Sequence, residues 1–363
     1  MNICKRCIMS DKADPTITFD SDGYCNYCTK ALCKINTTTY FPNEEGKRRL
    51  DEMLATIKKD GEGKEYDCIM GISGGLDSSY LAFLGCKWGL RILAVHIDDG
   101  FDTDISKKNI QKLVNATGMT LKTIIPDAEQ YYALTKAYMK AGVPNLAIPQ
   151  DNILFAFLYD EIKRNHIKYF LTGTNFALEC ITQTGNSHNP LDVVNIKDIQ
   201  KKFGTNRIDK LQFISLYQRF IDQKIYGITT LKPLNYIDYN RDRAFKELYD
   251  FCGFEYYGRK HLENILTAFV QLYWLPKKFG VDKRSSHLSS MIVSGQMTRE
   301  EALREYAEPL YDEKQMKEYI EMVKEKLHIS DKEFDDIMSG PTHQHADYKI
   351  DKIAKKLSNI FLK

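Results

Sequence analysis

The stretch that decides the fold is residues 66–80, which read YDCIMGISGGLDSSY. Residues 66–72 are apolar except for Asp67, and such a run predicts a central parallel strand that is covered on both faces. The Ser-Gly-Gly turn at 73–75 carries no bulky side chain, so successive backbone N–H groups can point at one anion. The helix predicted after the turn directs its positive N-terminal end at the same place. The stretch therefore predicts a phosphate-binding turn between a buried strand and a helix.

The two residues after the turn add groups that a nucleotide site requires. Asp77 offers a carboxylate for Mg²⁺, and Ser78 offers a hydroxyl for a phosphate oxygen. No lysine follows the glycines, so the GxxxxGK[ST] pattern is absent and an ordinary γ-phosphate cradle is disfavoured. A glycine turn with a purely structural role is the alternative interpretation.

The string SGGLDSS at 73–79 resembles the SGGxDS signature of the PP-loop ATP pyrophosphatases. This resemblance implies an adenine nucleotide alpha hydrolase-like fold and cleavage of ATP to AMP and pyrophosphate. It also implies that AMP is placed on a carbonyl-type oxygen, from which a nitrogen or sulfur nucleophile then displaces it.

A second buried strand is predicted at residues 91–97, RILAVHI, and it ends at an Asp-Asp-Gly sequence. In open α/β sheets the ligand lies beyond the carboxyl ends of the strands, so this end should face the same crevice as the glycine turn. In the PP-loop superfamily the corresponding strand end lines the adenosine pocket. The resemblance therefore implies nucleotide contacts at Val95, His96 and Ile97, mainly through backbone groups, and a structural role for His96 is an equal alternative.

A second glycine turn, GTNFALE at 173–179, follows a strand predicted at 168–172. Asn175 and Glu179 are four residues apart and would share a helix face on which the carboxylate could hold a cation. GTNxxxE resembles the second ATP and magnesium motif of NAD synthetase-type PP-loop enzymes. The two motifs together imply Mg²⁺ ligands at Asp77 and Glu179 and ATP contacts at Ser73, Gly74, Gly75, Asp77, Ser78, Gly173, Thr174 and Asn175.

The N-terminal residues 1–40 carry two C-x-x-C pairs, Cys4 with Cys7 and Cys25 with Cys28. Two such turns can meet in a tetrahedral thiolate site, and a segment this short has little core without one. Structural Zn²⁺ is the prediction, and rubredoxin-like iron or two metal-free redox pairs are the alternatives. Cys33 could be a stray ligand but is better explained as a buried thiol.

The segment from residue 256 onward is predicted to be helical, with basic clusters near 260 and 284 and a helix start at Thr298. It resembles the C-terminal region of the N-acetyl sugar amidotransferases of bacterial surface-glycan and lipopolysaccharide pathways. Those proteins combine a similar cysteine set with SGGLDSS and a KH-E segment, which here is Lys260-His261-x-Glu263. The resemblance spans residues 3–311.

This resemblance implies an ATP-dependent amidotransferase that converts an acetamido sugar, free or nucleotide-linked, into an acetamidino sugar. We expect Lys260 and Arg284 to bind a sugar carboxylate or the leaving phosphate, and His261 to accept a proton. The chain shows no glutaminase motif, so the resemblance implies a separate glutaminase subunit that supplies ammonia.

Alternating strands and helices predict a doubly wound, mainly parallel α/β sheet with a small zinc module and a helical C-terminal region. The predicted divisions are a zinc-binding module at 1–40, a PP-loop domain at 41–190, a lid or connecting insertion at 191–255 and a helical substrate or partner region at 256–363. Residues 183–230 are polar and leave a mobile lid and a packed insertion equally open. Residues 350–361 read as an amphipathic helix that could pack on its own domain, on a partner or on a membrane surface.

Composition and net charge restrict the class of protein that the chain can belong to. The 363 residues carry a net charge of +2 and nine cysteines, without a leader or a membrane-length apolar run, which predicts a cytoplasmic enzyme without a nucleic-acid partner. The main rival is a PP-loop tRNA thiolation enzyme, for which Cys180 is the best placed sulfur. A nucleotide-binding regulatory protein is a further alternative.

Overall fold

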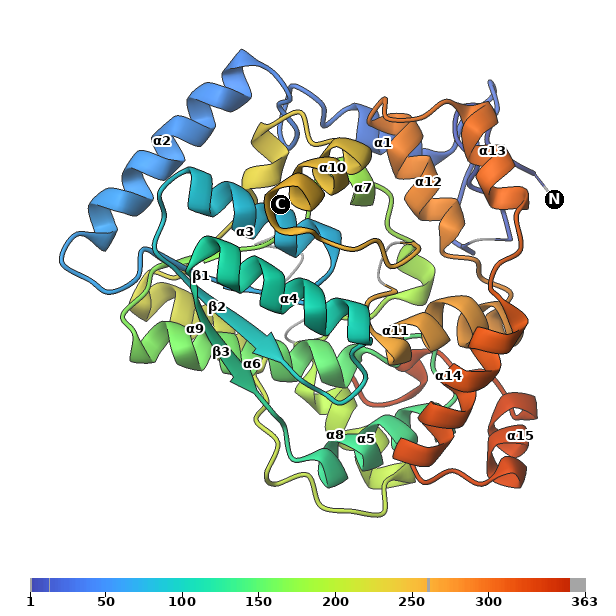
Figure 1. Cartoon of the computed structure of the whole chain (residues 1–363). Helices are drawn as coiled ribbons and strands as arrows, with labels where there is room; N and C mark the ends of the chain where they lie inside the picture. The colour runs from blue at the N-terminus through green and yellow to red at the C-terminus, as the bar shows by residue number, and fades with distance from the viewer. Residues whose placement is uncertain (1, 13, 260–261, 353–363) are drawn as a thin grey trace.

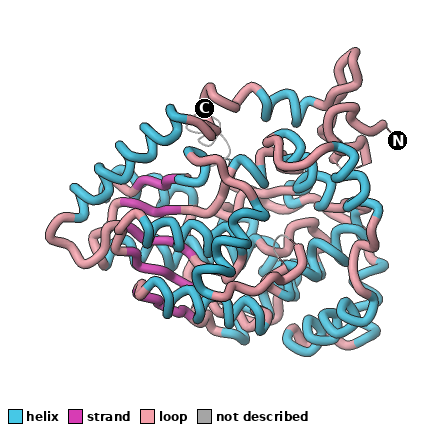
Figure 2. Tube along the Cα trace, turned by 45° about the horizontal axis from the view of Figure 1, so that its top comes forward, coloured by secondary structure: helices cyan, strands magenta, loops and turns pink. Residues whose placement is uncertain are grey.

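The computed structural model describes residues 2–12, 14–259 and 262–352. Its centre is a five-stranded sheet in the order β3-β2-β1-β4-β5, with every neighbouring pair parallel (Figures 1 and 2). The strands are β1 (Cys68–Gly71), β2 (Ile92–Ile97), β3 (Thr120–Ile124), β4 (Tyr169–Leu171) and β5 (Thr229–Leu231). The chain leaves β1 toward β2 on one side and returns to β4 on the other. The carboxyl ends of β1 and β4 therefore form the switch point at which parallel sheets bind ligands.

Helices cover both faces of the sheet, because successive strand side chains point to opposite sides. On one face Met70 and Ala94 pack against α3 (Leu76–Lys87) and α4 (Asp104–Thr117), with α2 (Glu44–Gly61) and α10 (Arg241–Cys252) beside them. On the other face Ile69 and Leu93 pack against α6 (Ile148–Arg164), and α9 (Leu216–Tyr226) lies next to α6. The predicted doubly wound parallel architecture is confirmed.

A second core joins helices from distant parts of the sequence around Trp274, whose indole N–H donates to the Val143 carbonyl at 3.0 Å. Ile196 and Ile199 of α8 are fully buried in it, so this part of segment 183–230 is a packed insertion. The helices of this core are α5 (Ala128–Lys140), α8 (Val193–Phe203), α11 (Ile265–Phe269), a π-helix at Val270–Phe279, α14 (Glu313–Lys326) and α15 (Asp331–Ser339).

The N-terminal module lies against α12 (Arg284–Val293) and α13 (Arg299–Ala307), as Figure 1 shows. Ile8 packs with Leu288 and Ala302, and the Arg299 guanidinium donates to the carbonyls of Cys4 and Cys7 at 3.2 and 3.1 Å. The module itself contains α1 (Asn26–Leu32). Its cysteine turns are thus fixed to the C-terminal helices.

Two sequence expectations differ from the structure, and a third cannot be compared with it. The sheet extends beyond residue 190, because β5 pairs with β4. The described residues 256–259 and 262–264 are not helical: Asn109 bonds both backbone groups of Glu255, and Thr103 bonds the carbonyl of Glu263. Most of the predicted amphipathic tail, residues 353–363, lies outside the described residues. The capping box at Thr298 is confirmed.

The remaining short elements are α7 (Phe176–Glu179) and the 3₁₀ turns at Thr184–Asn186, Pro233–Tyr236 and His345–Asp347. Among the described residues, no helix has both the length and the apolarity needed to span a bilayer.

Candidate nucleotide site

The first glycine turn connects the buried strand β1 to α3, as the sequence predicts. Gly74 has φ +73°, and a Cβ at this position would lie 2.5 Å from the Ser106 carbonyl oxygen, so both conformation and space require glycine there. Gly75 is the N-cap of α3 and supplies no capping side chain. The turn therefore presents the N-terminal end of a twelve-residue helix without a side chain of its own in the way.

The N–H groups of this turn donate to hydroxyl oxygens of the chain itself. The Ser73 N–H donates to Ser78 Oγ at 3.3 Å and the Gly75 N–H to Ser73 Oγ at 3.2 Å. The Leu76 N–H, in the first turn of α3, donates to the Tyr257 hydroxyl at 2.6 Å. These N–H groups are the kind of donor that a phosphate binds at a helix N-terminus.

The second glycine turn, between β4 and α7, lies directly on the first helix. A Cβ on Gly173 would lie 2.9 Å from both the Asp77 carbonyl carbon and the Ser78 nitrogen. Thr174 lines the cavity described below, whereas the Asn175 amide caps α7 by accepting from the Leu178 N–H at 2.9 Å. The structure therefore brings both predicted motifs together but places Asn175 in a helix cap.

The two carboxylates predicted to hold Mg²⁺ line the same cavity. Asp77 accepts a hydrogen bond from the Tyr239 hydroxyl at 2.5 Å, and Glu179 accepts the Asn175 N–H at 3.3 Å. Burial and the adjacent Asp77 carboxylate raise the pKa of Tyr239 well above its usual value, so the tyrosine stays a donor. A pair of carboxylates suits Mg²⁺, which takes few protein ligands and completes its shell with water and substrate phosphates.

The end of β2 contributes His96 and Ile97 to the cavity wall. Val95 does not reach the cavity: its side chain is fully buried and its carbonyl accepts the Ile72 N–H at 2.9 Å within the sheet. The structure thus places Val95 in the core, and its backbone oxygen already accepts the N–H of Ile72, the residue after β1.

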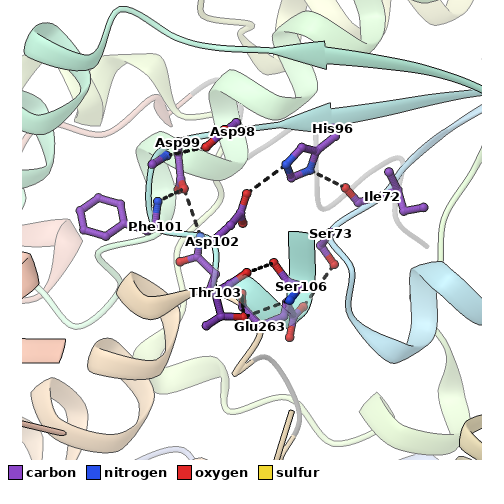
Figure 3. A network of polar contacts seen from close by, with 12 residues as sticks. Ile72, Ser73, His96, Asp98, Asp99, Phe101, Asp102, Thr103, Ser106 and Glu263 are labelled. Atoms are coloured by element: carbon purple, nitrogen blue, oxygen red, sulfur yellow. Dashed lines mark hydrogen bonds and ion pairs between the residues drawn. The ribbon is translucent and has the colours of Figure 1, made fainter. Parts of the chain in front are cut away.

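His96 links β1 to the loop after β2 (Figure 3). Its Nδ1 lies 2.9 Å from the Ile72 carbonyl and its Nε2 lies 3.0 Å from an Asp102 carboxylate oxygen. Burial alone would lower the pKa of His96, but the Asp102 carboxylate and the Ile72 carbonyl outweigh burial and raise the pKa. Both nitrogens face acceptors, so the geometry favours the imidazolium form and a positioning role.

Asp99 lies in the same loop after β2 and is buried. Its carboxylate accepts hydrogen bonds from Tyr131 at 3.1 Å, Gln150 at 2.6 Å and Asn264 at 3.1 Å. Burial raises the pKa of Asp99 to about 6. The hydrogen bond from Asn264, the N-cap of α11, connects this loop to the C-terminal helices.

A single cavity of about 440 Å³ connects these groups. Its apolar part is formed by α6 and the ends of β1 and β4, and its polar part by the two glycine turns and the loop after β2. The far wall comes from the C-terminal part of the chain, and its members include Arg241, Arg259, Glu263, Arg284, His287 and Met291.

Arg284 is the only one of the three predicted C-terminal site residues that the structure describes. It lines the cavity, and its guanidinium pairs with Asp282 at 2.8 Å and donates to the Glu308 carbonyl at 2.9 Å. Lys260 and His261 lie outside the described residues.

The predicted metal cluster is assembled. The sulfurs of Cys4, Cys7, Cys25 and Cys28 all lie within 4.8 Å of one another and are fully buried. The Cys7–Cys25 and Cys4–Cys28 sulfur pairs are 3.6 and 3.7 Å apart, close to the edge of about 3.8 Å expected for a tetrahedron with Zn–S bonds of about 2.3 Å. Among the residues that the structure describes, no other group of three or more potential ligands occurs. The donor set therefore fits structural zinc, while Cys33 is exposed and apart from the cluster.

Cys180, the cysteine that a thiolation enzyme would use, does not line the cavity. Burial raises its pKa to about 12, and its thiol faces the Ser290 carbonyl at 3.8 Å. A thiol in this state is a poor nucleophile, so the position disfavours sulfur transfer.

Sequence reasoning missed the tyrosines that complete the site. Tyr239 and Tyr257 contact the first turn of α3 although they lie more than 160 residues away in the sequence. No local sequence pattern predicts these contacts. Glu263 belonged to the KH-E pattern, but the pattern gave it no role.

Comparison with known proteins bears on the far wall of the cavity. Residues 263–360 match the family described as "LPS biosynthesis protein WbpG-like, C-terminal domain". Solved structures similar to this chain include an NH3-dependent NAD synthetase from Campylobacter jejuni subsp. jejuni NCTC 11168 in complex with the nitrate ion. The two sequences are 17% identical, the match covers 50% of this chain and 84% of that chain, and the TM-score is 0.30. An NMN synthetase from Francisella tularensis shares 14% identity over 57% of this chain and 92% of that chain, also with a TM-score of 0.30. No curated protein sequence matches this chain.

Proposed function

We propose that this chain, which carries a WbpG-like C-terminal domain at residues 263–360, is an ATP-dependent sugar amidotransferase of lipopolysaccharide or surface-glycan biosynthesis. It would adenylate the acetamido oxygen of an N-acetyl sugar and replace that oxygen with ammonia-derived nitrogen. The products would be an acetamidino sugar, AMP and pyrophosphate.

One observation carries the proposal: the SGGLDSS turn and the matched C-terminal domain share a single cavity. Ser73 and Asp77 form one wall and Glu263, Arg284 and His287 form another. A nucleotide held by the first wall would therefore face a substrate held by the second.

The chemistry explains why both walls are needed. An amide oxygen is a very poor leaving group, and ATP, when bound, supplies the adenylyl group that makes it a good one. In the first step the amide oxygen forms a bond to the α-phosphorus, the bond to pyrophosphate breaks, and the amide nitrogen loses its proton. In the second step ammonia adds to the amide carbon. The bond between that carbon and the adenylated oxygen then breaks, AMP leaves with the oxygen, and a proton is lost from the new nitrogen.

The chain's own residues would contribute positioning and charge. Ser73, Ser78 and the N-terminal end of α3 would bind phosphate oxygens, and Asp77 with Glu179 would hold Mg²⁺ at those oxygens. Magnesium, when bound, neutralises charge on the leaving pyrophosphate. The far wall would orient the sugar so that its amide oxygen reaches phosphorus in line.

The nitrogen source is proposed to be a separate glutaminase subunit. Free ammonium at high concentration would replace it in a purified system, because the adenylated sugar needs only ammonia as its nucleophile.

The test is mass spectrometry of products from the purified chain with ATP, Mg²⁺, ammonium and a panel of bacterial acetamido sugars and their nucleotide-linked forms. The expected result is a sugar in which NH replaces O, formed together with AMP. Asp77→Asn should abolish both products, whereas Glu52→Gln on the exposed face of α2 should not. Release of ADP, or no product with any sugar at high ammonium, would overturn the proposal.

A further inference from the structure

Tyr257 is the residue after α10 whose hydroxyl meets the backbone of the first turn of α3. The hydroxyl oxygen accepts the Leu76 N–H at 2.6 Å, and Leu76 is the first residue of that helix. The same side chain lines the cavity, together with Ser73 and Asp77. A phenol therefore lies at the end of α3 to which the proposed function assigns phosphate.

The surrounding structure fixes the direction of this phenol. The backbone before it is anchored to α4, because the Asn109 side chain donates to the Glu255 carbonyl at 2.9 Å and accepts the Glu255 N–H at 2.8 Å. Three aromatic rings surround the Tyr257 ring, with centroids 6.2, 6.4 and 6.3 Å away, namely Phe245, Phe254 and Tyr256. The hydroxyl thus has one place to go, which is the N-terminal end of α3.

The two tyrosines at the first turn of α3 use their hydroxyl groups differently. Tyr239 donates its proton to the Asp77 carboxylate. Tyr257 instead accepts an N–H, and this is the one hydrogen bond that its hydroxyl makes with the described residues. Burial raises the pKa of Tyr257 well above its usual value, so the hydroxyl keeps its proton. The O–H group of Tyr257 is therefore available to an acceptor that binds in the cavity.

A hydroxyl in this position extends the donor end of the helix by one group. The N–H groups of the first helical turn have no partner within the helix and attract anions. A hydroxyl that accepts one of them and donates outward continues the same polarity, because successive hydrogen bonds polarise one another. A charged phosphate oxygen is a stronger acceptor than a neutral oxygen. The chemistry that completes the hydroxyl is therefore a phosphate oxygen.

We propose that Tyr257 is a further binding residue of this site, whose hydroxyl donates to a phosphate oxygen at the pyrophosphate end of ATP while it accepts the Leu76 N–H. The inference rests on the proposed function, since it takes the first turn of α3 as the place of that pyrophosphate end. It adds a residue that lies outside both the SGGLDSS motif and the matched domain at 263–360.

The test is calorimetric binding of pyrophosphate with Mg²⁺, and separately of AMP, to the full chain and to Tyr257→Phe. This variant keeps the ring and its packing but has no hydroxyl. Its affinity for pyrophosphate should fall by about tenfold, the usual effect of losing a hydrogen bond to a charged group. Its affinity for AMP should stay equal to that of the wild type. An equal loss for AMP would overturn the assignment to the pyrophosphate end.

Tyr249→Phe is the matched control, because Tyr249 lies on α10, is exposed and does not line the cavity. It should bind both ligands as the wild type does. Unchanged pyrophosphate affinity in Tyr257→Phe would mean that the hydroxyl only caps the helix, and tighter binding would mean that it competes with phosphate. Either result overturns the inference. If the wild type itself binds no pyrophosphate, the site assignment in the proposed function fails first, and this inference falls with it.

Replacement of Tyr257 by a fluorinated tyrosine separates donating from accepting without removing the oxygen. The fluorinated phenol loses its proton at a lower pH, and its phenolate can still accept the Leu76 N–H but cannot donate. Pyrophosphate affinity, taken relative to the wild type at each pH, should therefore fall as pH rises through the ionisation of this phenol, which its absorbance follows. A relative affinity that stays level across that ionisation would contradict donation by Tyr257.

Discussion

The cysteine module and the candidate nucleotide site are built in opposite ways. The four cysteines of the module that could hold a metal lie within residues 4–28, and two short turns bring them together. The candidate nucleotide site collects Asp77 from α3, Glu179 from α7, Tyr239 from the segment before α10 and Glu263 from the segment before α11. A site made from one short segment can be recognised from spacing alone, whereas a site made from many segments depends on the whole fold.

The two regions are nevertheless connected through α12. Its residues Arg284, His287 and Met291 line the cavity, while Leu288 packs with Ile8 and Ser289 accepts the Ile8 N–H at 3.1 Å. A disturbance of the module should therefore reach the cavity wall, and a disturbance of the glycine turns should leave the module intact.

The largest effect is expected from Cys25→Ser. Loss of one thiolate should release the metal, and structural zinc contributes on the order of 10 kcal/mol to folding in small modules. We expect loss of bound zinc by elemental analysis, a lower melting temperature and weaker substrate binding through α12. The matched control is Cys33→Ser, since Cys33 is exposed and apart from the cluster. Full zinc retention in Cys25→Ser would show that the cluster is not the metal site.

Gly173→Ala should come next and should spare the module. The new methyl group would collide with the backbone at Asp77 and Ser78, which cannot move without shifting the first turn of α3. Backbone overpacking of this kind costs about 1–3 kcal/mol, and misplaced binding groups add a loss of nucleotide affinity. Zinc content should remain that of the wild type. Gly118→Ala, where nothing lies within 4 Å but φ is +65°, controls for backbone strain alone. Equal nucleotide binding in the two variants would contradict the close contact of the two turns.

The features that could be predicted from the sequence are those that depend on residues close together in the chain. The parallel strands, both glycine turns and the four cysteines were found because each follows from spacing or apolar runs within a few residues. Tyr239, Tyr257 and the position of Glu263 could not be found, because their partners are Asp77, Leu76 and Thr103, far away in the chain. The helical expectation was wrong at residues 256–259 and 262–264 for the same reason: long-range hydrogen bonds to the backbone outweighed local propensity.

Tyr239→Phe tests the contribution of a single hydroxyl, the one that donates a hydrogen bond to Asp77. The tyrosine is buried, stacks on Tyr80 at 5.5 Å and donates to Asp77, so its loss should leave packing intact and the carboxylate less well oriented. Groups that orient metal ligands are worth about 10–100-fold in metal affinity or activity. Mg²⁺ titrations of AMP formation should show a higher magnesium requirement with little change in melting temperature. A normal requirement for Mg²⁺ would mean that Asp77 does not ligate the metal.

The smallest effect should be the pH dependence of stability at His96. The pKa of His96 is raised in the folded protein, so the folded state binds its proton more tightly than the unfolded state. Its contribution is therefore fully present below the unfolded pKa and is lost as pH rises through the folded pKa. Urea unfolding of wild type and His96→Gln should show a stability difference that shrinks as pH rises from about 6 toward about 9. A difference that grew with pH would mean that His96 is held neutral, and the link between Ile72 and Asp102 would then need only one proton.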